Sequence, residues 1–339
     1  MSTARFIKSR KMQAPTPRRT GWSARFSATA LLTVTMAVPA VAVVVPASAS
    51  AAAPPCSTTC YVSTTGDDTN DGGSAAHPLR HIQTAVTDVN AGGIVAVAAG
   101  TYVEDVAITK AVLIQGAGID QSIVSGAIGG PLLSAFQVQA SNVIIDGFTI
   151  TREGNTAAHW MDGNLNSGGV SIQGQSVTNT VIRNNKIYGN RTGVDINDSN
   201  GNSVVNNLIE DNRTGLILRN QTDNTTVTEN VISANFTDGV VFLDASSGTN
   251  LPVQSAINST FSNNSISGNW YGGVAERQSG VSLAAPGTNV KNFSGNWFGT
   301  TTPVVTTSPT GEPGYSLAQL PVIFGGTATA PSCRTRRRG

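Results

Sequence analysis

The sequence is poor in charge and lacks long helical patterns. Asp, Glu, Lys and Arg make up 12% of its 339 residues, whereas glycine is abundant at 36 residues. This composition is typical of a turn-rich all-β chain. No repeat unit holds a helical run of about ten residues, which argues against leucine-rich and helical repeat proteins.

Cysteine is scarce as well. It occurs only at Cys56, Cys60 and Cys333, and these positions do not resemble a metal-binding cluster. In an exported chain Cys56 could bond to Cys60, or either of them could bond to Cys333. One thiol is left over in every case, so the sequence leaves the pairing open.

Acidic residues are absent from the first 53 positions, which carry seven Lys and Arg. An apolar stretch follows over residues 28–45, and Ala47-Ser48-Ala49 offers a small-residue cleavage site. This order is typical of a secretory signal peptide and looks bacterial. We therefore expect a signal peptide at 1–53, a linker at 54–60, and a secreted or cell-surface protein with no membrane span after cleavage. An uncleaved anchor is the alternative.

Positive charge becomes scarce once this leader is removed. The rest of the chain has 20 acidic residues against 14 basic ones, because seven of the 21 Lys and Arg lie in the leader. Four of the remaining basic residues lie in the short tail 334–338. The acidic body argues against nucleic acid as a partner.

One repeat dominates residues 181–299. Asn-Asn-x-Ile recurs with Gly a few residues later, and in looser copies Glu229 or Gly295 replaces the first Asn. The Asn at the second position of each copy serves as a marker: Asn185, Asn207, Asn230, Asn264 and Asn296. The shortest spacings are 22 and 23 residues, and the longer ones contain insertions. Repeats of this length indicate a solenoid in which each turn covers its neighbour.

Each repeat contains short stretches in which apolar residues alternate, such as Val194/Ile196 and Leu216/Leu218. A period of two predicts strands, and Asn and Gly suit the sharp corners between them. Three strands and three corners in about 22 residues describe a parallel β-helix. The chain thus resembles the right-handed parallel β-helix (pectate-lyase-like) superfamily, which implies that the marker Asn side chains stack as a buried ladder. Phe148 takes the ladder position one turn earlier.

The N-terminal part has the order Tyr61-Val62-Ser63, a short helical pattern around Ile82, Ala85 and Val86, and then Gly100-Thr101-Tyr102. This order resembles the start of many secreted β-helix proteins, in which the helix caps the open end of the solenoid. We predict an all-β, single-stranded right-handed β-helix over 61–300 with an N-terminal capping α-helix. Residues 301–339 form a Thr/Pro-rich tail or cap.

The resemblance places the active face on the strands that follow each Asn-x-x-Gly corner. Stacking these strands by register predicts two outward columns: Ser171, Asp195, Ile217, Val241 and Gln173, Asn197, Arg219, Leu243. Insertions at 151–169 and 244–256 flank this face. We expect a groove that binds sugars through aromatic faces and Arg side chains. Its substrate-binding candidates are Trp160, Arg191, Arg213, Trp270 and Tyr271; an ordinary solvated face is the alternative.

Uronate lyases and epimerases need a base and a group that neutralises the substrate carboxylate. Asp195, Arg219 and His159 are the catalytic candidates. The catalytic motifs of pectate lyases, polygalacturonases and mannuronan epimerases are absent, which weakens the enzyme hypothesis.

Asp67, Asp68, Asn70 and Asp71 lie in one loop ending at Gly72, and their oxygen atoms could bind Ca²⁺. Asx turns explain the same loop equally well. Asn-x-Ser/Thr sequons recur along the chain, and repeated turns generate them without glycosylation. Among them are those that begin at Asn190, Asn212, Asn220, Asn224, Asn235 and Asn258.

Taken together, these features favour an exported, monomeric protein that binds or acts on an acidic polysaccharide or cell-surface glycan. The alternative is a noncatalytic surface or adhesion module with the tail as a spacer. A third hypothesis, a β-helix protein that assists metal-centre assembly, lacks a supporting cluster of Met, His or Cys.

Overall fold

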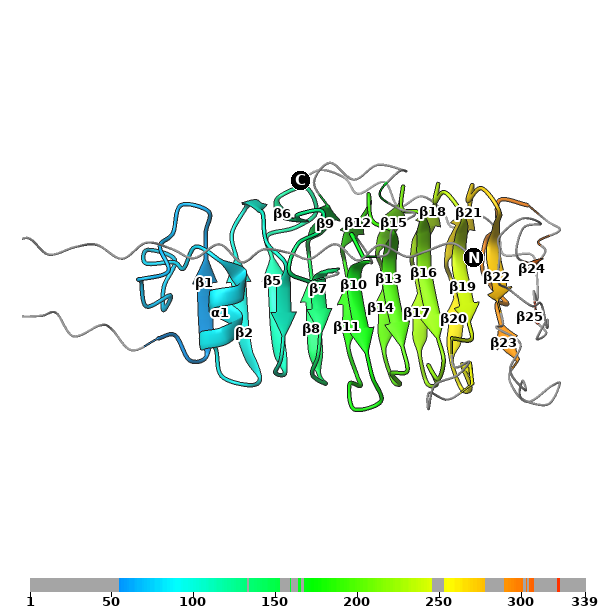
Figure 1. The fold of residues 1–339 in the computed structure, drawn as a ribbon, viewed down its shortest axis with the longest axis horizontal. Helices are drawn as coiled ribbons and strands as arrows, with labels where there is room; N and C mark the ends of the chain where they lie inside the picture. Colours follow the sequence, from blue (N-terminus) through cyan, green and yellow to red (C-terminus); the bar gives the residue numbers. More distant parts are fainter. Residues whose placement is uncertain are drawn as a thin grey trace, which may run out of the picture. The chain divides into compact units, whose positions relative to one another are not determined.

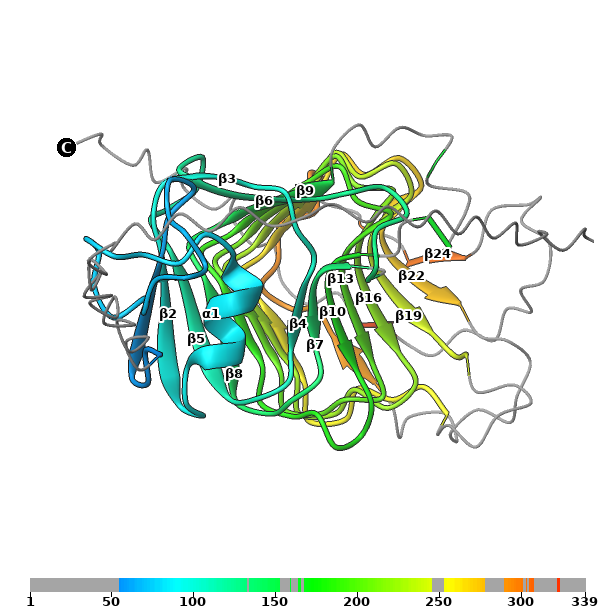
Figure 2. The same cartoon turned by 60° about the vertical axis from the view of Figure 1, so that its left-hand side comes forward.

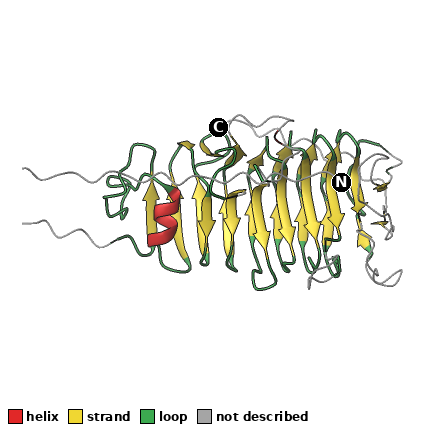
Figure 3. Cartoon of the chain, viewed as in Figure 1, coloured by secondary structure: helices red, strands yellow, loops and turns green. Residues whose placement is uncertain are grey.

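The computed structural model describes residues 55–132, 134–152, 159, 164–165, 168–245, 253–277, 290–300, 303, 305–307 and 322–323. The expected signal peptide lies outside these ranges. Within them, the chain winds through three parallel sheets, A, B and C, and returns to the same sheet once per turn (Figures 1 and 3). The fold is the predicted right-handed parallel β-helix.

Sheet A contains eight strands in the order of the chain: β1 (Thr59–Val62), β2 (Gly93–Val97), β5 (Val112–Gly116), β8 (Val143–Asp146), β11 (Val181–Arg183), β14 (Ser203–Val205), β17 (Thr226–Thr228) and β20 (Thr260–Ser262). Sheet B contains β3 (Gly100–Tyr102), β6 (Ser122–Gly126), β9 (Thr149–Arg152), β12 (Lys186–Ile187), β15 (Leu208–Glu210), β18 (Val231–Ser233) and β21 (Ser265–Ser267).

Sheet C follows the Asn-x-x-Gly corner. Its strands are β4 (Val106–Ile108), β7 (Ser134–Val138), β10 (Gly168–Gln173), β13 (Thr192–Asn197), β16 (Thr214–Arg219), β19 (Asp238–Leu243), β22 (Gly272–Arg277) and β24 (Val305–Thr307). β23 (Lys291–Asn292) pairs with β25 (Val322–Ile323). β24 and β25 therefore show that part of the predicted tail 301–339 forms strands, because its Val-rich segments can pair with earlier ones.

The core consists of the inward columns of the three sheets. On sheet C, Val194 aligns with Val170 and Leu216, and all three side chains are buried. The next inward column contains Phe242, whose ring packs edge-on against Phe261 of sheet A at 5.5 Å between centroids. The register also confirms both outward columns that the sequence predicted.

The predicted Asn ladder is present at the corner between sheets A and B. The side-chain amide of Asn185 donates to Oδ1 of Asn207 at 3.1 Å, and Asn207 donates to Asn230 in the same way at 3.0 Å. Asn264 and Asn296 continue the series. Phe148 occupies the preceding turn, and its backbone N–H donates to Oδ1 of Asn185. Each buried amide is thus satisfied by its neighbour above and below.

A second ladder, which the sequence reading missed, lies at the corner between sheets B and C. Asn190 donates to Asn212 at 3.1 Å, Asn212 to Asn235 at 3.2 Å and Asn235 to Asn269 at 2.8 Å. Asn190, Asn212 and Asn235 are almost fully buried. These three sequons therefore serve the core and cannot carry glycans in the folded chain. The missed signal was the constant offset of five residues from the first ladder.

The glycine after this ladder is required by close packing. A Cβ on Gly215 would lie 2.5 Å from the carbonyl oxygen of Gly239 on the next turn. Any larger residue would push the turns apart, which explains why Gly recurs in each Asn-x-x-Gly corner.

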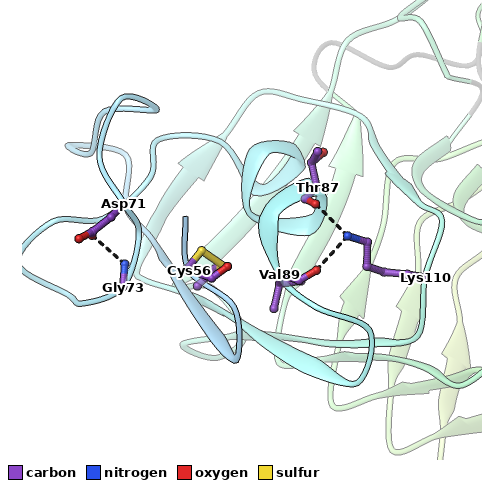
Figure 4. Close-up of a disulfide and its surroundings, with 7 residues drawn as sticks. Cys56, Asp71, Gly73, Thr87, Val89 and Lys110 are labelled. Atoms are coloured by element: carbon purple, nitrogen blue, oxygen red, sulfur yellow. Dashed lines mark hydrogen bonds between the residues drawn. A yellow bond between two sulfur atoms is a disulfide. The ribbon is translucent and has the colours of Figure 1, made fainter. Parts of the chain in front are cut away.

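The N-terminal turns are held differently. The helix α1 (Ile82–Asp88) contacts β1, β2 and β4 and lies between sheets A and C in Figure 2. Both carboxylate oxygens of Glu104 accept from the first helical N–H groups, and Lys110 Nζ donates to the carbonyls of Thr87 and Val89 (Figure 4). The negative charge of Glu104 thus lies at the N-terminus of α1 and the positive charge of Lys110 at its C-terminus, where each interacts favourably with the helix dipole. That α1 acts as a cap remains a prediction.

Residues 56–60 differ from the predicted linker. Cys56 and Cys60 form a disulfide (Figure 4) and both are buried. Strand β1 already begins at Thr59, because Cys60 and Val62 alternate into the core. Along the parts of the chain described above, no helix is long and apolar enough to span a membrane.

Candidate functional site

The corner between sheets B and C carries one column of side chains immediately after the second ladder. Arg213 N–H donates to the carbonyl of Asn190, Phe236 N–H to that of Asn212, and Trp270 N–H to that of Asn235. Each turn therefore contributes the residue that follows its ladder Asn. We call Arg191, Arg213, Phe236 and Trp270 the corner column.

The later half of the corner column is aromatic and exposed. Trp270 is 64% exposed and Phe236 45% exposed. Their ring centroids lie 5.0 Å apart, and Tyr271 stacks on Trp270 at 4.5 Å with an interplanar angle of 23°. A continuous exposed aromatic surface of this kind is unusual on a soluble protein and suits stacking against a ring-shaped ligand.

The earlier half is basic. Arg191 and Arg213 are partly buried and follow the same ladder on successive turns. Guanidinium groups bind carboxylates through two parallel hydrogen bonds. The structure thus brings together four of the five predicted substrate-binding residues, Arg191, Arg213, Trp270 and Tyr271, and adds Phe236, which the sequence reading did not select. Trp160 lies outside the described residues.

Asp195 and Arg219 face each other on adjacent strands of sheet C. Arg219 Nε donates to Oδ1 of Asp195 at 2.8 Å, and Nη2 bonds to Oδ2. The negative charge of Asp195 raises the pKa of Arg219. The pair is therefore bidentate and charge-assisted, which makes it a strong interaction.

Amide side chains extend this pair across three turns. Asn220 donates to Asn197 at 2.7 Å, Asn197 donates to Gln173 at 2.8 Å, and Gln173 reaches Asp195 at 3.4 Å. The series ends at the Asp195 carboxylate, which accepts from the Gln173 amide. The network fixes Asp195 and Arg219 in place, so both are oriented before any ligand arrives.

The face that holds this network is less open than predicted. Asp195 is 7% exposed, Ser171 6% and Val241 2%. Arg219 and Gln173 contact the Asp195 carboxylate and help to shield it. Three of the four residues of this column are therefore buried, unlike those of the ordinary solvated face that the sequence left as the alternative.

The predicted site residues form two groups. Asp195 on β13 lies four residues after Arg191, which corresponds to about 13 Å of extended chain. The ion pair and the corner column therefore share one side of the solenoid without direct contact between Asp195 and Arg191. His159 is partly buried, and its neighbours in the insertion lie outside the described residues.

The predicted calcium loop is occupied by its own hydrogen bonds. Asp67 accepts from Thr69, Asp68 from the backbone of Arg80 and His81, and Asp71 from Gly73. The Asn70 amide donates to Pro78. Among the residues that the structure describes, no group of three or more His, Cys, Asp or Glu is placed to hold a metal ion. These contacts are compatible with Asx turns, and calcium binding by this loop stays a prediction.

Proton affinities in this loop follow the same contacts. The backbone and side-chain hydrogen bonds of Thr69 lower the pKa of Asp67. Partial burial acts to raise the pKa of Asp68, but hydrogen bonds from His81 and Arg80 lower it overall. His81 Nδ1 lies 2.5 Å from Asp68 Oδ2.

A buried ion pair lies near the start of the solenoid. Arg152 Nη1 is 3.3 Å from Asp105 Oδ1, and neither side chain is exposed. Burial raises the pKa of Asp105 and lowers that of Arg152. Arg152 also donates to the carbonyls of Ala127 and Leu132, so the pair ties the loop after β6 to the end of β9.

Comparison with known proteins agrees with the fold. The family described as "Right handed beta helix region" matches residues 85–284. A search of curated proteins found no match to the chain.

Similar solved structures include pectate lyase Pel9A, with 16% identity over 76% of this chain and 74% of that chain and a TM-score of 0.49. An alginate lyase from Paenibacillus sp. str. FPU-7 has 14% identity over 79% and 98%, with a TM-score of 0.48. The A-module of mannuronan C-5 epimerase AlgE4 from Azotobacter vinelandii has 16% identity over 61% and 64%, with a TM-score of 0.38. At these identities the similarity concerns the fold alone.

Proposed function

Because the chain belongs to the right-handed β-helix family, we propose that it is an exported protein that binds an acidic polysaccharide along the corner between sheets B and C. One observation carries the proposal. The corner column places two Arg side chains and two exposed aromatic rings on four successive turns. Aromatic faces bind sugar rings, and guanidinium groups bind their carboxylates.

The geometry suits an extended chain. Neighbouring turns of a parallel sheet lie about 4.8 Å apart, so the corner column offers one contact per turn along the solenoid. A polymer that runs parallel to the solenoid axis would meet Trp270 and Phe236 first and Arg213 and Arg191 next. The charge on the Arg half favours an acidic glycan over a neutral one.

A binding experiment tests this directly. Titration with pectate, alginate and hyaluronan, and with dextran as the neutral comparison, should show binding of an acidic polymer that weakens with salt. Trp270→Ala should weaken it about tenfold through lost stacking. Val231→Ala is the matched control, because Val231 is an exposed apolar residue on the outer face of sheet B at 40% exposure. Equal affinities of the two variants would refute the assignment.

A lyase or epimerase is the second candidate, favoured by the presence of Asp195 and Arg219 on sheet C. In a catalytic role Arg219 would neutralise a uronate carboxylate, and Asp195 or His159 would act as the base. The structure sets a condition on this role: Asp195 is already engaged by Arg219 on two oxygens. A substrate carboxylate would have to replace Asp195 on Arg219 before Asp195 could accept a proton.

An ultraviolet assay for unsaturated uronate product distinguishes the two candidates. Product formation that disappears in Asp195→Ala, with folding intact, would establish catalysis. Binding without product, and with no effect of Asp195→Ala, would support the noncatalytic surface module, with residues 301–339 as a spacer. Parallel assays with calcium and with a chelator test the calcium prediction at residues 67–71.

Export and monomeric state are part of the same proposal. The basic and apolar leader at residues 1–53 supports secretion. Sequencing the N-terminus of protein recovered from the culture medium of its producing cell should find it near residue 50. Sedimentation should give the mass of one chain.

A further inference from the structure

A pocket of about 320 Å³ lies on the outer side of sheet A, at the N-terminal end of the solenoid and on a different sheet from the proposed glycan site. Its floor is formed by β2 and the end of β5, and one wall by the segment that follows β1. Tyr61, Ser63, Pro78, Ala96, Gln115 and Ala117 are among its lining residues. Its size falls at the lower end of the roughly 300–1,000 Å³ typical of small-molecule sites.

The strand register explains why a pocket forms here. Tyr61 on β1 aligns with Ala96 on β2, which aligns with Gln115 on β5. All three side chains belong to the same outward column. The short Ala96 side chain thus lies between the long side chains of Tyr61 and Gln115. This leaves a gap one turn wide in the column, which we call the notch.

The width of this notch fits one ring. Tyr61 and Gln115 are two strand spacings apart, or about 10 Å at the backbone. A ring in contact with both walls needs about 7–8 Å between them, since each contact spans about 3.5–4.0 Å. One six-membered ring therefore fits between the side chains of Tyr61 and Gln115.

The walls are rigid. Tyr61 N–H donates to the carbonyl of Gly72 and its own carbonyl accepts from Leu79 N–H. Ser63 N–H donates to the carbonyl of Leu79 at 2.9 Å, and the Cys56–Cys60 disulfide links β1 to the segment that precedes it. A ligand would meet a pre-organised site and would not have to order a loop on binding.

We propose that this notch binds one neutral pyranose unit. None of the residues that line the pocket is charged, so the pocket offers no counter-charge to a phosphate, a uronate or an ammonium group. Tyr61 supplies the stacking surface, and the Gln115 amide offers both a donor and an acceptor for sugar hydroxyls. The Ser63 hydroxyl, which lies 3.0 Å from that of Thr65, offers a third polar contact at the rim.

The site is independent of the corner column and can be tested without it. Ligand-observed NMR titrations with the methyl glycosides of glucose, galactose and mannose should show that at least one binds, whereas methyl glucuronide binds more weakly because its carboxylate finds no cation. Ala96→Leu should weaken binding at least tenfold by filling the notch. Tyr61→Ala should weaken it about tenfold by removing the stacking face.

Thr228→Leu is the matched control. Thr228 lies in the same outward column of sheet A on β17, so this variant adds a Leu to the same kind of surface far from the notch. It should bind the sugar as the unmodified protein does. Absence of binding by every neutral glycoside, or equal affinities of Ala96→Leu and Thr228→Leu, would overturn the proposal. Retained circular dichroism of Tyr61→Ala guards against a folding artefact.

Discussion

The repeat region, residues 181–277, and the N-terminal region, residues 55–152, solve the same packing problem by different means. In the repeats, two Asn ladders satisfy the buried corners, and each turn uses the same groups as the next. In the N-terminal region the corners are irregular, and a disulfide, a short helix and one buried ion pair hold the turns. In the repeats, the loss of one interaction leaves equivalent interactions on the neighbouring turns. In the N-terminal region, a lost interaction has no equivalent elsewhere.

This difference predicts where the chain is most sensitive to single changes. The strongest test is the Asp105–Arg152 pair. Arg152→Met leaves the Asp105 carboxylate buried without its counter-charge, and we expect a loss of about 3–5 kcal/mol in the free energy of unfolding. Urea denaturation measures this loss, and hydrogen exchange should place the lost protection within residues 100–152.

The double variant Asp105→Leu/Arg152→Met supplies the control. It removes both charges together and should recover much of the stability, because a buried ion pair adds little over apolar packing. If the double variant is no more stable than Arg152→Met, the loss arises from side-chain shape and the electrostatic explanation is wrong.

The second test breaks a ladder in its middle. Asn207→Ala removes the acceptor of the Asn185 amide and the donors to Asn230, Ile182 and Val205. Because buried groups on both sides lose partners, we expect about 2–4 kcal/mol of destabilisation. Protection from hydrogen exchange should decrease in both neighbouring turns and stay unchanged in β1–β5.

Asn206→Gly is its matched control. Asn206 is the exposed neighbour with φ of 55°, a conformation that Gly adopts readily. It should change the stability by only a few tenths of a kcal/mol. A large effect of Asn206→Gly would show that the turn itself, and not the buried amide, holds the corner.

The same contrast explains which parts could be predicted from the sequence. The first ladder, the phenylalanine at its start and the outward columns of sheet C were predicted correctly, because repetition lets one copy be aligned on another. The second ladder was present in the same pattern, but Asn190, Asn212 and Asn235 were interpreted only as turn residues. The sequence Asn-x-Thr is compatible with both a turn and a buried Asn ladder, so it does not distinguish between them.

The N-terminal contacts could not be predicted in this way. Asp105 and Arg152 occur once, 47 positions apart in the numbering, and no periodicity links them. The same holds for Glu104, which binds the start of α1 from a later segment. At the candidate site, the sequence placed Asp195 and Arg219 in neighbouring columns but could not show that they bind each other.

The third test concerns the disulfide. Replacing Cys56 and Cys60 with Ala opens a very short loop, so the chain-entropy contribution is only about 2 kcal/mol. We expect that loss in urea denaturation, with exchange increased around β1 and the loop 71–79. Because that loop forms one wall of the notch beside Tyr61, affinity for a neutral glycoside should fall in the same variant. Reduction of the disulfide in the unmutated protein should give the same loss of stability. That result would attribute the loss to the missing bond and not to the Ala side chains.

The smallest effect is the pH dependence of the N-terminal region. Burial raises the pKa of Glu104 and of Asp105. Each folded-state pKa then lies above its unfolded value, so the folded chain binds these protons more tightly. Ionisation of these carboxyl groups therefore costs stability above the folded-state pKa. That cost is relieved as the pH falls toward the ordinary pKa values of 4.5 for Glu and 3.8 for Asp. From pH 7 to about pH 5 we expect a gain of about 1 kcal/mol or less in the free energy of unfolding, located by hydrogen exchange in α1 and β4.

Glu104→Gln should flatten this dependence of stability on pH in the N-terminal region and leave that of the repeats unchanged. An equal slope in both proteins would mean that the carboxylate at the start of α1 titrates alike in the folded and unfolded chains.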